Sequence, residues 1–201
     1  MAAPPCVYHE QQGRAECGLA ALNMVLGRSV FSLSEALQEG SAFEAHYERE
    51  GCPIDLDEHT HEHGYFSDLY LGWLLERLQI HEPHWPRFNM RPISPMQLHM
   101  IEHPQVLGIL VHSGEEGLEE LQGHWYAIAK CDSICYKLDS LKAREQGGVL
   151  MITDYNEALP PDGRPFKLIA VETTADAATL LLPFEVHEVP HQLSDAGRFS
   201  G

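Results

Sequence analysis

The sequence predicts an α+β fold in which helices come first and an antiparallel sheet follows. Apolar residues recur at helical spacing in the first half of the chain, whereas the second half carries short apolar or alternating runs between Gly, Asp, Ser and Pro. With 201 residues, 44% of them hydrophobic, the chain is long enough for one domain with its own core. We therefore expect the N-terminal helices to pack on a C-terminal antiparallel sheet.

The first helix is expected at residues 17–26, with the sequence CGLAALNMVL. Leu19, Leu22 and Leu26 recur near helical spacing, and Gly27 stands where a glycine commonly ends a helix. Because the segment is apolar on nearly every side, we expect this helix to be buried.

Two more helices are expected to form a hairpin. Ser32 with Glu35 three residues later has the pattern of a capping box, and Gly40 would end that helix. Residues 43–50 would return as a second helix before Gly51. The polar segment 55–64 that follows is expected to be a loop.

Two later helices have start signals of their own. Ser67 and Asp68 precede a segment with leucines on a wide face, which is typical of a core helix. Ser94 followed by Pro95 starts a further helix, and Pro104 ends it.

Four runs predict the strands of the sheet: residues 106–111, 125–129, 134–138 and 166–171. The segment 112–122 is too polar to be a strand, so the first two runs should form a hairpin with a long loop. Residues 180–189 are consistent with an edge strand.

Composition excludes two classes of partner. Thirteen Lys and Arg against thirty Asp and Glu give a net charge of −17, which would repel nucleic acid and anionic membranes. No run of ~18 apolar residues is present for a membrane span, and the opening MAAPP lacks the features of a signal peptide. We expect a cytoplasmic protein, with the nucleus as a second location.

Five cysteines at irregular spacing argue against a disulfide framework. Cys131 and Cys135 have the wrong context for a redox pair and are interpreted as unreactive residues near a turn. Cys17 differs because it begins a helix. It either fills space in the core, as free cysteines commonly do, or is a nucleophile whose thiolate the helix N-terminus stabilises.

A cysteine hydrolase also needs a base, a group that orients the base, and a donor for the oxyanion. His124 begins the run at 125–129, Asp139 follows the run at 134–138, and Gln12 lies five residues before Cys17. Adjacent antiparallel strands would bring His124 and Asp139 within hydrogen-bonding distance. Asp139 would then fix the tautomer of His124, which would take the proton of Cys17.

Four segments in chain order resemble a Josephin domain: YHEQQGRAECGLAALNMVLG at 8–27, GYFS at 64–67, GHWYAI at 123–128 and YKLDSL at 136–141. Josephin domains are papain-like cysteine proteases that act as deubiquitinases, and their helical hairpin borders the ubiquitin site. The resemblance spans about residues 7–172 and leaves 173–201 as a C-terminal extension.

The resemblance implies a role for each candidate residue. Cys17 would be the nucleophile, His124 the general base and acid, Asp139 the orienting residue, and Gln12 the oxyanion donor. Trp125 would line the groove for the ubiquitin tail; the alternative is an ordinary core aromatic. The substrate would be ubiquitin or polyubiquitin, cleaved after its C-terminal glycine, and the chemistry would need no cofactor and no metal.

Two other functions remain open. The phrase ECGLAALNMVLG also resembles bacteriocin-processing peptidases that cut after double-glycine leaders, although these do not explain YHEQQG or GYFS. The chain could also be a Josephin-like module that binds ubiquitin without cleaving it.

Two clusters have both a structural and a functional interpretation. Glu58, His59, His61, Glu62 and His63 either belong to a solvated loop or bind a divalent metal. Acidic residues at 115–120 either keep a loop soluble or attract a basic substrate such as the arginine-bearing tail of ubiquitin.

Overall fold

The computed structural model describes residues 7–12, 16–60, 66–114, 123–131, 133–160, 165 and 167–174. Its α-helices are α1 (Cys17–Leu26), α2 (Leu33–Gln38), α3 (Gly40–Arg49) and α4 (Asp68–His81). Its strands are β1 (Phe88–Pro92), β2 (Val106–Ser113), β3 (His124–Cys131), β4 (Ile134–Leu138), β5 (Val149–Ile152) and β6 (Lys167–Thr173). Short 3₁₀ helices lie at η1 (Leu56–Glu58), η2 (Pro95–Glu102), η4 (Arg144–Gln146) and η5 (Tyr155–Ala158). The predicted α+β class is confirmed.

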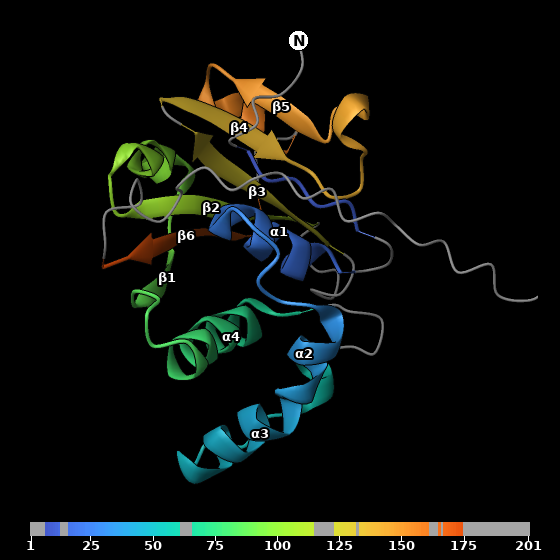
Figure 1. Ribbon diagram of the computed structural model, residues 1–201, viewed down its shortest axis with the longest axis vertical. Coiled ribbons are helices and arrows are strands. Elements are labelled where there is room, and N and C mark those ends of the chain that lie inside the picture. Colours follow the sequence, from blue (N-terminus) through green and yellow to red (C-terminus); the bar gives the residue numbers. More distant parts are fainter. Residues whose placement is uncertain are drawn as a thin grey trace, which may run out of the picture.

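The strands form one sheet in the order β1-β6-β2-β3-β4-β5, and every neighbouring pair is antiparallel (Figure 1). The four expected strands are present, and β2 pairs directly with β3 as a hairpin. The two edge strands, β1 and β5, were not expected. The sequence of β1, FNMRP, ends in proline and lacks clear alternation, which an edge strand tolerates because it has one neighbour.

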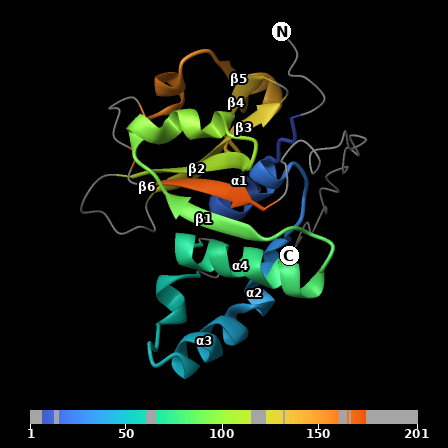
Figure 2. The same cartoon turned by 90° about the vertical axis from the view of Figure 1, so that its left-hand side faces the viewer.

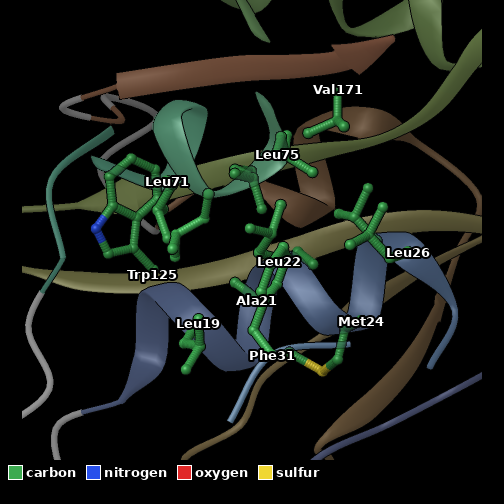
Figure 3. Packing of buried hydrophobic residues seen from close by; sticks show 14 of the residues in the cluster. Leu19, Ala21, Leu22, Met24, Leu26, Phe31, Leu71, Leu75, Trp125 and Val171 are labelled. Carbon is green, nitrogen blue, oxygen red and sulfur yellow. The ribbon is translucent and has the colours of Figure 1, made fainter. Parts of the chain in front are cut away.

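The helix α1 is the centre of the larger hydrophobic core. All ten of its residues are buried, and it packs on β2 and β3. Figure 3 shows Leu22 directed toward Leu71 and Leu75 of α4, with Trp125 of β3 beside them. The prediction of a buried helix is confirmed, including its end at Gly27, which has a φ of 75°.

A glycine in β2 lets α1 approach the sheet closely. The pairing of β2 with β6 shifts register between Val106 and Gly108. A Cβ atom on Gly108 would lie 2.7 Å from the carbonyl oxygen of Ile128 and 3.0 Å from a methyl carbon of Val25 in α1. Only glycine fits between the helix and the neighbouring strand at this point.

The opposite face of the sheet carries a second hydrophobic cluster. Leu98 and Ile101 of η2 pack there with Ile109 and Ile128 of the central strands. Figure 2 shows η2 and α4 on opposite sides of the sheet. The helix expected after Ser94 is therefore present, as a 3₁₀ helix with a capping box formed by Ser94 and Gln97.

The expected helical hairpin is only partly correct. Ser32 and Glu35 form the predicted capping box at the start of α2. Gly40, however, does not end a helix: it begins α3, and only Glu39 separates α2 from α3. An added Cβ on Gly40 would lie 3.1 Å from Leu56, so close packing explains this glycine. Figure 1 shows α3 at the end of the molecule farthest from β5, and the chain returns through η1.

Several expectations fall outside the described residues: the edge strand at 180–189, most of the extension at 173–201, and the acidic residues 115–120. Within the described part of the chain, no helix has the length and apolarity needed to cross a membrane.

Cys131 is disulfide-bonded, whereas Cys17, Cys52 and Cys135 are free. Cys131 and Cys135 are therefore not paired with each other, as expected, but the bond of Cys131 to another cysteine was not predicted, because spacing in the sequence does not show which cysteines meet in space.

A buried asparagine joins α1 to the segments on either side of it. Asn23 is fully buried, and its amide donates to the Glu10 carboxylate at 3.0 Å and to the Phe31 carbonyl at 2.9 Å. Its side-chain oxygen accepts from the backbone N–H groups of Val30 and Phe31, each at 3.0 Å. The network fixes the chain before α1 and the chain that leads into α2.

We predict that Asn23→Ala lowers the free energy of unfolding by about 3 kcal/mol, because it leaves buried polar groups without partners. Urea denaturation followed by circular dichroism measures the change. The matched control is Asn89→Ala on the exposed side of β1, which should stay within about 0.5 kcal/mol of the wild type. Equal stabilities for the two variants would contradict the role given to Asn23.

Candidate active site

The structure brings His124 and Asp139 together at one end of the sheet. His124 begins β3 and Asp139 follows β4, and these strands are paired with Ala127 opposite Leu138. The Nε2 atom of His124 lies 2.8 Å from Oδ1 of Asp139. Both side chains are largely shielded, with 21% and 11% of their surfaces exposed. The strand register thus produces the contact expected from the sequence.

Cys17 lies next to His124 because α1, which begins with Cys17, packs on β3. It is the first residue of α1, it is buried, and its thiol is free. The packing of α1 on β3 sets its side chain in a hydrogen bond with His124. The side chain of Glu16, the residue at the helix N-cap, does not cap the helix. The thiol of α1, the imidazole of β3 and the carboxylate after β4 are therefore joined in series by hydrogen bonds, and we call this series the line.

The charges of His124 and Asp139 stabilise each other. Burial alone would lower the pKa of His124, but its hydrogen bonds with Asp139 and Cys17 outweigh burial and raise the pKa to about 9. Burial would raise the pKa of Asp139, but the hydrogen bond and charge of His124 and the N–H of Leu141, at 3.1 Å, lower it to about 2. At neutral pH the pair is an imidazolium and a carboxylate.

Gln12 lies beside the carboxylate end of this line. Its backbone N–H donates to the carbonyl of Ser140 at 3.0 Å. Its side-chain oxygen accepts a hydrogen bond from the Ser140 hydroxyl at 2.6 Å. The residue after Asp139 therefore holds both the backbone and the side chain of Gln12.

Two residues of this site were not predicted, His9 and Ser140. The Nε2 atom of His9 lies 3.1 Å from the backbone oxygen of Asp139, and burial lowers the pKa of this histidine. Ser140 is fully buried. Both lie within the motifs that pointed to Gln12 and Asp139. Their contacts depend on how residues 7–12 cross the turn after β4, which no sequence pattern reports.

Trp125 lies in the core and not on an open surface. Its side chain is only 1% exposed, and its ring centroid is 4.6 Å from that of His112. An added Cβ on Gly18 would lie 3.3 Å from the indole, which shows how closely α1 covers the ring. The structure therefore agrees with the core alternative and places the indole beneath the candidate site.

The possible metal cluster is only partly described. His59 donates to or accepts from the Ser67 hydroxyl at 2.9 Å through Nδ1, and its ring packs edge-on against Phe43. Residues 61–63 lie outside the described part. Among the residues that are described, no group of three or more His, Cys, Asp or Glu side chains is arranged to hold a metal ion.

Comparison with known proteins identifies relatives of the chain. No family model matches it. The chain is 31% identical over 158 residues to Josephin-2 from Homo sapiens, and 32% identical over 158 residues to Josephin-2 from Mus musculus. Each alignment covers 72% of this chain and 74% of the relative. The chain belongs to the Josephin family.

Proposed function

We propose that this protein is a deubiquitinase with the papain-like fold of Josephin domains. The observation that carries the proposal is the line formed by Cys17, His124 and Asp139, because it joins a nucleophile to a base and the base to an orienting carboxylate. Membership of the Josephin family supports ubiquitin as the substrate. The bond cleaved is the peptide or isopeptide bond after the C-terminal glycine of ubiquitin.

In the first half of the reaction, the Cys17 thiolate attacks the carbonyl carbon of that glycine and forms a C–S bond. The carbonyl oxygen takes up the negative charge and is held by the backbone N–H of Cys17 and the amide of Gln12. The His124 imidazolium then gives its proton to the leaving amine as the C–N bond breaks. The products of this half are the free amine and a thioester on Cys17.

In the second half, neutral His124 takes a proton from water while the water oxygen bonds to the thioester carbon. The C–S bond breaks, and the thiolate and imidazolium return, while ubiquitin leaves as a carboxylic acid that keeps the second hydrogen of the water and then releases that proton to solvent. The raised pKa of His124 fits the first half, because the residue must hold a proton at neutral pH until the leaving amine takes it. It fits the second half because a group with a raised pKa is a stronger base toward water.

We predict that a ubiquitin probe with a C-terminal electrophile forms one covalent adduct with the wild type and none with Cys17→Ala. The adduct appears as a ubiquitin-sized mass increase on a denaturing gel and by intact mass spectrometry. The control is Cys52→Ala, which removes an exposed free thiol and should leave labelling unchanged.

The same experiment separates the other functions. An adduct that survives Cys17→Ala would show that another thiol reacts. Folded wild type that binds ubiquitin without forming an adduct would support a binding module. Cleavage after a double-glycine leader peptide, with neither binding nor adduct, would support the leader-peptidase function.

We predict that kcat/KM for a ubiquitin C-terminal fluorogenic amide falls on the alkaline side with an apparent pKa of about 9. The sign follows from the chemistry: above this pH, His124 loses the proton that the leaving amine needs. In Asp139→Asn the carboxylate charge is gone but an acceptor oxygen remains, so the alkaline limb should move down by about 1 pH unit or more.

Values of kcat/KM measured between pH 6 and pH 10 give the alkaline limb of the wild type and that of Asp139→Asn. Asp57→Asn is the matched control, because it makes the same carboxylate-to-amide change at an exposed position in η1. An alkaline limb that stays in place in Asp139→Asn would contradict the assignment of the proton to His124.

A further inference from the structure

We propose that Ser140 is a positioning residue whose hydroxyl sets the orientation of the Gln12 amide, so that the amide presents its NH₂ group to the oxyanion. This inference rests on the proposed function and deepens it. It assigns a role to a buried side chain that does not itself meet the substrate.

The hydrogen-bonding capacity of Ser140 leads to this role. Its side chain is fully buried, so solvent does not reach the hydroxyl. Within the described part of the chain, the partner of this hydroxyl is the side-chain oxygen of Gln12, at 2.6 Å. This distance lies within the normal range for an O–H···O hydrogen bond.

A glutamine amide has two orientations related by a half-turn about its last torsion. With its oxygen on Ser140, the opposite edge of the planar amide is the NH₂ donor. With the amide reversed, the Ser140 oxygen would accept from the NH₂ group, but the Ser140 hydrogen would lose the acceptor that Gln12 provides, which disfavours that orientation in a buried site. It would also turn a carbonyl oxygen toward the oxyanion, where like charges repel. The hydroxyl therefore selects the orientation that can stabilise the transition state.

The backbone around Ser140 makes this selection rigid. The Gln12 N–H donates to the Ser140 carbonyl at 3.0 Å, so the two residues are joined twice. The N–H of Asp139 donates to the carbonyl of Gly148 at 2.8 Å, and His9 contacts the Asp139 carbonyl. Two consecutive residues thus orient two catalytic groups: Asp139 orients the base, and Ser140 orients the oxyanion donor.

The test is a double-mutant cycle of Ser140→Ala and Gln12→Ala, with kcat and KM measured on a ubiquitin C-terminal fluorogenic amide. Gln12→Ala should lower kcat about 100-fold. Ser140→Ala should lower kcat about 10-fold or more with KM nearly unchanged, because the amide then samples both orientations. In the Gln12→Ala background, Ser140→Ala should cost less than about 2-fold, because no amide remains to be oriented.

Conservative variants separate positioning from structure. Ser140→Thr keeps the hydroxyl and should restore most of kcat, and Ser34→Ala on the exposed face of α2 should match the wild type. Gln12→Glu keeps the acceptor for Ser140 but has no NH₂ group, so it should lose kcat as strongly as Gln12→Ala. If thermal unfolding shows that Ser140→Ala does not fold, Ser140→Cys replaces it in the cycle, because a thiol is a weaker donor of similar size and should lower kcat in the same direction.

Three outcomes would overturn the proposal: wild-type kcat in Ser140→Ala, an equal loss from Ser140→Ala in both backgrounds, or wild-type kcat in Gln12→Glu. In all three the wild type is active, so the proposed function stands. A folded wild type with no turnover would instead reject the proposed function, and the role of Ser140 would fall with it.

Discussion

The packing of α1 against β2 and β3 determines how Cys17 and His124 lie relative to each other. The helix carries the thiol at its first residue, and the strand beneath it begins with the histidine. Gly108 allows the close approach, because a side chain there would meet the backbone of Ile128 and the side chain of Val25. The burial of α1 thus stabilises the core and also places Cys17 beside His124.

Electrostatic interactions then set the protonation state of His124. A histidine as shielded as His124 would ordinarily be neutral, because burial disfavours its charged form. Asp139 reverses this preference by accepting a hydrogen bond at 2.8 Å, and the hydrogen bond with Cys17 acts in the same direction. The segment 7–12 closes the arrangement by crossing the turn after β4, where it is held at His9 and Gln12.

Local signals made much of the fold predictable. The caps at Ser32, Ser67 and Ser94 and the apolar runs of the central strands have strong short-range patterns, and all appear where they were expected. Gly40 was misinterpreted because a glycine that packs against Leu56 looks, in sequence, like a glycine that ends a helix. The edge strands β1 and β5 were missed because they bury only part of their surface and need little alternation.

The contacts of the candidate site were predictable where the strand register determines them and less predictable where they depend on the path of a loop. His124 and Asp139 could be paired because each adjoins one of two neighbouring strands. Ser140 and His9 act through contacts between segments far apart in the chain, and the burial of Trp125 depends on how closely Gly18 lets α1 cover it. The most direct test of this account is an NMR titration of the His124 imidazole in protein with ¹⁵N-labelled histidine, assigned with His124→Gln. We expect His124 to remain protonated at pH 8 and to titrate near pH 9, whereas titration at or below its ordinary value of 6.5 would contradict the coupling to Cys17 and Asp139.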